Sequence, residues 1–191
     1  MCLEKKFLSI IVKSIKLDKT LYKDNKNFDE ASIYFAIIII LLSALIGLIP
    51  GSIFLEFMSG AFGSTNIKGP SIRSVIITTI IVWLIKTAYL YFVGVVLFPS
   101  QATKCNYRKI LVTVGYASAP LILNAFIVNI NFLYFMFIPY IWYNISLIVG
   151  INHILKFENY FKSAIIVLGP IILLFLFLVN QLLNSYSSTI S

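Results

Sequence analysis

Charged side chains are scarce in this chain. Only 12% of its 191 residues are charged, whereas 60% are hydrophobic, and the mean hydropathy is +0.96. Soluble domains carry about 25% charged residues, so most of this protein's surface faces a medium other than water. We therefore predict an integral membrane protein, and chain length says nothing about the number of soluble domains.

The residue types that build catalytic and metal centres are also few. The chain has two cysteines, Cys2 and Cys105, and one histidine, His153. Neither a CxxC pair, an HExxH motif nor a pair of intramembrane aspartates occurs, and one histidine alone cannot hold a metal ion. We predict no catalytic residues, no metal site and no cofactor, and hence a protein that is not an enzyme.

Basic residues exceed acidic ones, which gives a net charge of +8, and seven of the fifteen lie within the first 26 residues. They share no folded polar domain, so we expect no nucleic-acid binding. Residues 5–21 predict an amphipathic helix, with Lys5, Lys6, Lys13 and Lys16 opposite a wide apolar face. Such a helix can lie in an anionic membrane interface or pack against the membrane bundle, and the sequence leaves both open.

Long uncharged runs predict an all-α, polytopic helix bundle with five transmembrane helices. About 20 apolar residues cross a bilayer, whereas residues 110–152 form an uncharged run of twice that length that must fold back, at the polar residues 129–131. Pro50 is expected to end the first helix, since the residue before proline avoids helix. Asn27 and Glu30 are expected to cap its start. The predicted spans are residues 31–50, 74–98, 110–128, 132–151 and 163–184.

Three regions follow from these spans. Residues 1–27 are a cytoplasmic amphipathic helix and linker, residues 28–184 the membrane domain, and residues 185–191 an outer tail. With the N-terminus in the cytoplasm, the inner segments hold twelve Lys/Arg and the outer segments two, as the positive-inside rule requires. The C-terminus then lies outside. We expect a prokaryotic cell membrane, or the endoplasmic reticulum or Golgi membrane if the protein is eukaryotic.

Lys86 is the most informative single residue. It lies near the centre of the second span, where a lysine costs at least ~2.5–3.5 kcal/mol on insertion scales. It either binds an anionic ligand, a lipid headgroup or a proton, or it extends its ammonium to a wet surface. We predict that it points into the bundle toward the third or fourth span, with Asn144, Tyr116 or Ser118 as a polar partner. Glu56, expected at the outer interface, is a further candidate companion.

Small residues suggest close helix contacts. Gly47 and Gly51 have GxxxG spacing in the first span, and Gly115 opens the stretch GYASAP in the third. Small residues let helices approach closely in lipid, so packing is the expected role of both. Pro120 removes one backbone hydrogen bond and is expected to kink the third span. Asn144 is expected to hydrogen-bond to a neighbouring helix.

The stretch Tyr107–Pro120 (YRKILVTVGYASAP) resembles the third-span signature of the Yip family, the Ypt/Rab-interacting five-span membrane proteins. A basic lead-in, Arg108 and Lys109, precedes the span, the pair Gly115-Tyr116 lies within it, and Pro120 follows. Residues 150–164 (GINHILKFENYFKSA) resemble the family's connection into the last span. The cytoplasmic N-terminus, the tight hairpin between the third and fourth spans and the short outer tail match as well, over residues 28–182.

This resemblance implies a non-enzymatic membrane adaptor that organises membrane or protein partners at the cytoplasmic face. Eukaryotic members carry an Asp-Leu-Tyr-Gly-Pro-type motif at the first span, where this chain reads Asn27-Phe28-Asp29-Glu30-Ala31. The chain therefore resembles a compact prokaryotic-type member, and GTPase binding is implied only for the eukaryotic branch. The alternative is a small transporter, channel or lipid-binding protein that uses Lys86 as an intramembrane anion site. The bilayer is the expected partner in either case, and homo-oligomerisation stays open.

Overall fold

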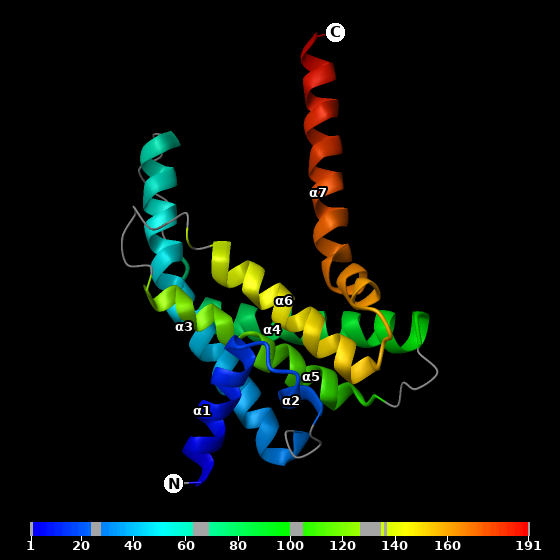
Figure 1. Cartoon of the computed structure of the whole chain (residues 1–191). Helices are drawn as coiled ribbons and strands as arrows, with labels where there is room; N and C mark the ends of the chain where they lie inside the picture. The colour runs from blue at the N-terminus through cyan, green and yellow to red at the C-terminus, as the bar shows by residue number, and fades with distance from the viewer. Residues whose placement is uncertain are drawn as a thin grey trace.

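Helices account for every regular element that the computed structural model describes, namely in residues 2–23, 28–62, 69–99, 105–126, 135 and 137–190 (Figure 1). The elements are α1 (Cys2–Ile15), α2 (Thr20–Lys23), α3 (Glu30–Phe62), α4 (Ile72–Tyr91), the π-helix η2 (Phe92–Leu97), α5 (Tyr107–Ala117), the 3-10 helix η3 (Ala119–Phe126), α6 (Phe137–Leu155) and α7 (Tyr160–Ile190). The predicted all-α fold is confirmed.

Within the described residues, five helical stretches are long and apolar enough to cross a membrane: Ala31–Phe57, Ile72–Leu97, Tyr107–Phe126, Phe137–Leu155 and Tyr160–Gln181. This confirms the five-span membrane bundle. The orientation of the termini and the outer tail stay predictions. The expected turn at residues 129–131 lies outside the described residues.

The third span, α5 with η3, forms the centre of the bundle. Its apolar window is 61% buried, whereas that of α7 is 17% buried. Ile110, Val112 and Tyr116 of α5 are fully buried, with α3, α4 and α6 packed around them. In contrast, every residue of the run 171–178 in α7 is at least half exposed, and α7 extends away from the other helices in Figure 1. Lipid is the medium that suits such a helix.

Pro120 interrupts the third span as predicted. The α-helix ends at Ala117 and continues as the 3-10 helix η3, which contains the buried Pro120. Proline has no N–H and its ring excludes the normal bond to the carbonyl four residues earlier, here that of Tyr116. That carbonyl instead accepts a 2.6 Å hydrogen bond from Ser14 Oγ of α1. The Ser118 carbonyl accepts one of 3.0 Å from Ser43 Oγ of α3.

The N-terminal segment is two helices, so the single helix predicted over residues 5–21 is wrong. Leu17 adopts a positive φ of 56°, and Asp18 N donates back to the Lys13 carbonyl at 2.8 Å, which closes α1 with a left-handed cap. Ser14 is buried against the bundle, whereas Leu8 is 60% exposed. Of the two alternatives left open by the sequence, α1 therefore packs against the membrane bundle, and part of its apolar face stays uncovered.

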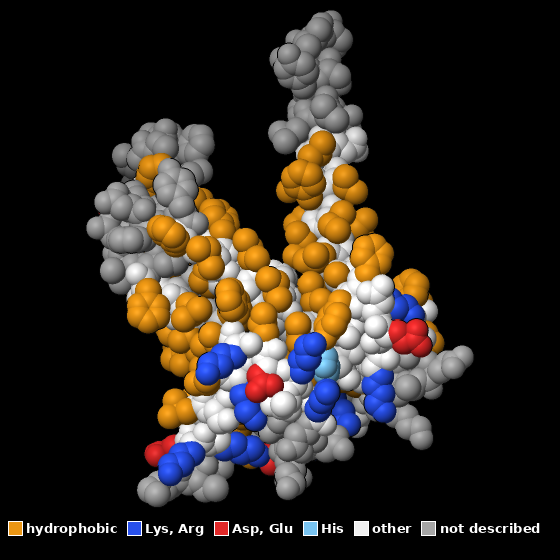
Figure 2. Space-filling model, in the orientation of Figure 1, with side chains coloured by type: hydrophobic (Ala, Val, Ile, Leu, Met, Phe, Trp, Pro, Cys, Tyr) orange, Lys and Arg blue, Asp and Glu red, His pale blue; other side chains and the backbone are white. Residues whose placement is uncertain are grey.

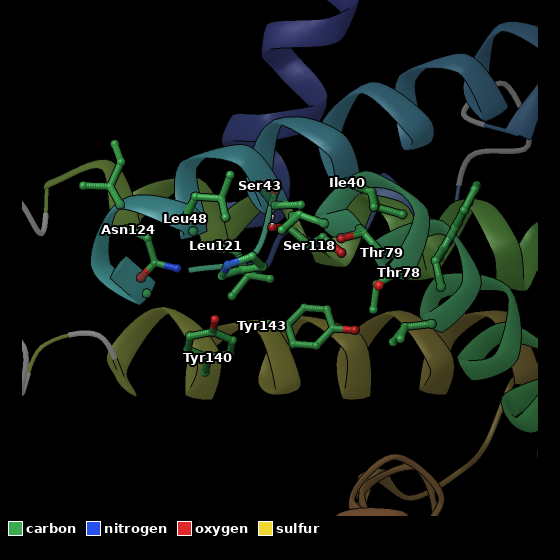
Figure 3. A pocket seen from close by; sticks show the side chains of 18 of the residues that line it. Ile40, Ser43, Leu48, Thr78, Thr79, Ser118, Leu121, Asn124, Tyr140 and Tyr143 are labelled. Atoms are coloured by element: carbon green, nitrogen blue, oxygen red, sulfur yellow. Dashed lines mark hydrogen bonds between the residues drawn. The ribbon is translucent and has the colours of Figure 1, made fainter. Parts of the chain in front are cut away.

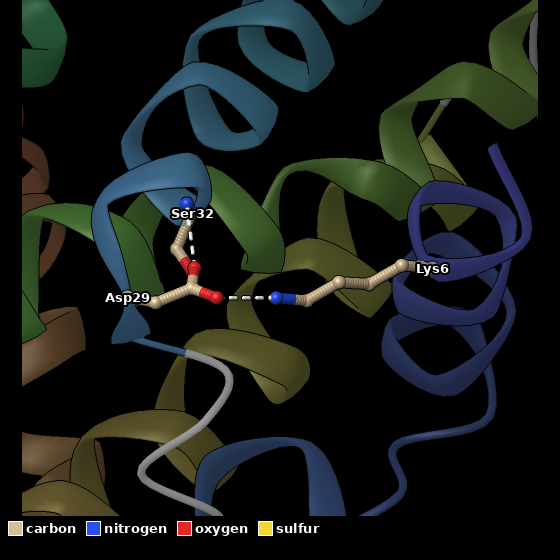
Figure 4. A network of polar contacts seen from close by, with 3 residues as sticks. All are labelled: Lys6, Asp29 and Ser32. Atoms are coloured by element: carbon tan, nitrogen blue, oxygen red, sulfur yellow. Dashed lines mark hydrogen bonds and ion pairs between the residues drawn. The ribbon is translucent and has the colours of Figure 1, made fainter. Parts of the chain in front are cut away.

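The start of the first span is capped, and its end differs from the one expected. Asp29 caps α3: its Oδ1 accepts hydrogen bonds from Ser32 N and Oγ, while its Oδ2 pairs with Lys6 Nζ of α1 at 2.6 Å (Figure 4). The expected cap Asn27 lies outside the described residues. Moreover, α3 continues through Pro50 to Phe62, because in lipid a continuous helix satisfies nearly every backbone group that a break would expose.

Candidate functional site

A cavity of about 860 Å³ lies between α3, α4, the third span and α6. It extends from Gly69 and Pro70, just before α4, to Lys86 near the middle of the second span. Figure 3 shows Ser118 and Thr79 near its centre, with Asn124 and Tyr140 toward one end and Tyr143 on the facing helix α6. Most of the lining is apolar, including Ile40, Leu48, Leu55, Val75, Val82 and Leu121.

Two glycines of α3 keep this space open. A Cβ added at Gly47 or Gly51 would meet no atom within 4 Å, and both residues line the cavity. The close helix packing expected of this GxxxG pair is therefore wrong. The missing side chains leave a recess in the face of α3 where the expected neighbouring helix does not approach.

Lys86 is the only charged side chain among the described residues that line the cavity. Its Nζ lies 4.4 Å from the centre of the Tyr143 ring on α6. A cation over an aromatic face gains about 0.5–2 kcal/mol, less than the ~2.5–3.5 kcal/mol that a lysine costs at mid-membrane. Lys86 thus points toward the fourth span, as expected. Its contact with Tyr143 offsets only part of the free-energy cost of placing the lysine there.

Asn124 supplies a second polar group in the cavity. Its side chain is 1% exposed, and its Oδ1 has no hydrogen-bond partner among the described residues. A buried acceptor without a donor costs about 1–3 kcal/mol. Ser118 also lines the cavity, but its hydroxyl already donates to the Val114 carbonyl at 3.0 Å. Asn124 is therefore the lining side chain with an evident unmet hydrogen-bond demand.

The other predicted site residues lie elsewhere. Gly115 faces α3, where an added Cβ would overlap Ala36, so it permits close packing as expected. Tyr116 is fully buried and Pro120 is buried in η3, and neither lines the cavity. Glu56 is exposed on α3 and does not line the cavity either.

Asn144 does not behave as predicted. Its Nδ2 donates at 2.8 Å to the Tyr140 carbonyl, one turn back in its own helix, and its Oδ1 has no partner among the described residues. The expected hydrogen bond to a neighbouring helix is thus wrong. The expected pairing of Lys86 with Asn144, Tyr116 or Ser118 is replaced by the contact with the Tyr143 ring.

Sequence reasoning missed two residues of the cavity. These are Tyr143 and Asn124, neither of which the sequence pattern singles out. Both are polar residues in otherwise apolar spans, which the sequence does show. However, Asn144 has the same property and does not line the cavity, so polarity alone could not have identified Asn124. In the described part of the chain, no three His, Cys, Asp or Glu side chains lie close enough together to hold a metal ion.

Five apolar helices, four of which line a largely apolar cavity whose one charged side chain among the described residues is Lys86, define a polytopic membrane protein with a ligand-sized cavity between its spans. The sequence model of the Yip1 domain matches residues 19–180, so the chain belongs to the Yip1 domain family. The resemblance seen in the sequence is thereby confirmed. Neither a curated protein nor a solved structure matches the chain significantly.

Proposed function

We propose that this protein is a non-enzymatic membrane adaptor that organises protein or membrane partners through its basic end. The observation that supports this role is the gathering of Lys and Arg side chains at one end of the molecule, visible on the face shown in Figure 2. They come from α1, its connection to α2, α2 itself, the start of α5, the connection after α6 and the start of α7. By the positive-inside rule, we propose that this end faces the cytoplasm.

Helix α1 is the part of this basic end best suited to contact a partner. It is attached through Ser14 and through the ion pair of Lys6 with Asp29. Its outer face keeps Leu8 and Val12 60% and 47% exposed. Lysines beside exposed apolar side chains suit an anionic membrane surface, where each contributes about 1 kcal/mol, or an acidic partner protein.

Site-specific photocrosslinking in native membranes tests the adaptor role. A photoreactive residue at Val12 is expected to form a discrete set of protein adducts, reduced when Lys13 and Lys16 are changed to Gln. The same residue at Leu174, on the exposed apolar face of α7, is the control and should give lipid adducts. Protein adducts that are equal at both positions, or none at Val12, would contradict the proposal.

The Lys86 cavity favours a second candidate function, a small lipid-binding or transport protein. A single cation in a mostly apolar cavity between spans is the arrangement that an anionic amphiphile requires. Reconstituted protein that moves a lipid or an anion across vesicles would identify a transporter. Binding without movement would identify a lipid-binding protein.

A further inference from the structure

We propose that the cavity beside Lys86 binds one anionic membrane lipid whose headgroup also carries a hydroxyl group. This inference rests on the second proposed function, lipid binding, and specifies its ligand. The anionic group would lie against the Lys86 ammonium, the hydroxyl would donate to Asn124 Oδ1, and hydrocarbon would occupy the apolar remainder. Lys86 belongs to α4 and Asn124 to η3, and the apolar walls come mainly from α3 and α4.

The anion is required by the position of Lys86. Its ammonium lies in the cavity within 4.4 Å of the Tyr143 ring centre, and among the described residues no acidic side chain lines the same space. An aromatic face attracts a cation but carries no net charge. A bound anion would therefore supply the charge that the protein does not.

The hydroxyl is required by Asn124. Its side chain is 99% buried, lines the cavity and leaves Oδ1 without a donor among the described residues. Asn144 also has a buried Oδ1 without a partner, but it lies outside the cavity. Asn144 therefore serves as a control residue, because within the described residues it has the same unpaired acceptor as Asn124 but does not line the cavity.

The apolar walls identify the ligand as a lipid and not as a free anion. The cavity volume of about 860 Å³ is within the ~300–1,000 Å³ range of sites for drug-sized ligands. Leu48, Leu55 and Val82 give hydrocarbon an apolar surface. A free phosphate would leave most of this surface without contact.

Quenching of Trp83 by brominated lipids measures binding directly, because Trp83 lines the cavity. Trp142, the second of two tryptophans, is changed to Phe so that Trp83 alone reports. Phosphatidylglycerol carries a net negative charge and hydroxyls, and phosphatidylmethanol carries a net negative charge without a hydroxyl. Phosphatidylcholine has no hydroxyl and no net charge, because its choline cation balances its phosphate. In detergent we expect affinity to fall in that order, by about three- to tenfold at the first step and about tenfold at the second.

Four variants assign these preferences to residues. Lys86→Gln should lower the affinity for both anionic lipids to that for phosphatidylcholine. Lys162→Gln, which removes a lysine lying 5.0 Å from the Phe157 ring centre outside the cavity, should change nothing. Asn124→Leu should remove the advantage of phosphatidylglycerol over phosphatidylmethanol, whereas Asn144→Leu should preserve it.

A variant that fills the site tests where the lipid lies. Gly47→Leu adds a side chain into open space and should abolish quenching by all three lipids while the protein stays folded. Inorganic phosphate should not displace bound phosphatidylglycerol, and displacement would show that a free anion occupies the site and overturn the inference.

Two failures remain distinguishable. If no lipid quenches Trp83, lipid binding itself is wrong and the second proposed function fails. If all three lipids bind equally, or Lys86→Gln behaves like Lys162→Gln, lipid binding stands and the proposed headgroup recognition is overturned.

Discussion

Two glycines of this chain have opposite roles, which only their surroundings distinguish. Gly115 of α5 lies against the backbone of α3, where an added Cβ would come within 2.9 Å of Ala36 Cα. Gly47 of α3 faces the cavity, with no atom within 4 Å of an added Cβ. The first glycine allows two helices to touch and the second leaves a space between them.

Alanine substitutions should separate these roles. Gly115→Ala should destabilise the protein by about 1–3 kcal/mol, the cost of overpacking a filled contact. Gly47→Ala should be neutral or stabilise it by about 0.5–1 kcal/mol, because glycine weakens a helix interior relative to alanine. Unfolding in detergent measures both, and equal effects would contradict the contact of α5 with α3.

At the scale of elements, the interrupted third span connects the N-terminal segment to the membrane bundle. The carbonyl of Tyr116, to which Pro120 cannot donate, accepts a hydrogen bond from the Ser14 hydroxyl, and Ser14 Oγ also lies 3.3 Å from Ser146 Oγ of α6. Tyr22 Oη of α2 lies at the same distance from Ser146. A helix break that would expose polar backbone thus becomes the attachment point of α1, and α2 joins the same cluster through Ser146.

The other attachment of α1 should depend on pH. The hydrogen bond from Lys6, followed by that from Ser32, holds the pKa of Asp29 below its ordinary value of 3.8. Since the folded pKa is the lower one, this contribution is complete above pH 3.8 and is lost as the pH falls through the folded pKa. We expect α1 to loosen in that acid range.

Trp142 can report this loosening, because its Nε1 donates to the Ile15 carbonyl at the end of α1. Its fluorescence, in a Trp83→Phe background, should change as the pH falls below 3.8. Asp29→Asn keeps a capping side chain but cannot titrate, so the acid step should disappear. A step of unchanged size in that variant would assign the transition to another group.

The whole molecule is polar at one end and apolar over most of its length. Lys and Arg side chains gather at the end that holds α1, and apolar side chains cover the extended parts of α3 and α7 (Figure 2). Because charge near a span sets its orientation, we propose that the basic end is cytoplasmic and that the C-terminus lies outside.

Thiol labelling tests this orientation. In a Cys2→Ser background, an impermeant maleimide added to intact cells should label a cysteine placed at Ser188 and spare Cys105. Burial raises the pKa of the Cys105 thiol to about 11, and the thiolate is the reactive form. After permeabilisation, Cys105 should therefore react slowly at neutral pH and faster as the pH rises. Labelling of Cys105 from outside intact cells would reverse the proposed topology.

The sequence by itself determined that this is an all-α, five-span membrane protein of the Yip family. Each span is a local property, since a run of about 20 apolar residues satisfies its own backbone as a helix in lipid. The same locality made the effect of Pro120 predictable, because a proline removes a hydrogen bond within its own helix.

Tertiary structure alone decided what lies between the helices. The docking of α1 through Ser14 and the juxtaposition of Lys86 with Tyr143 depend on segments far apart in the sequence. The cavity depends on even more, since it exists only where four packed elements fail to meet. Hydrophobic patterning fixes which residues enter the membrane, but the register of helix against helix fixes which of them touch, and no single segment encodes that register.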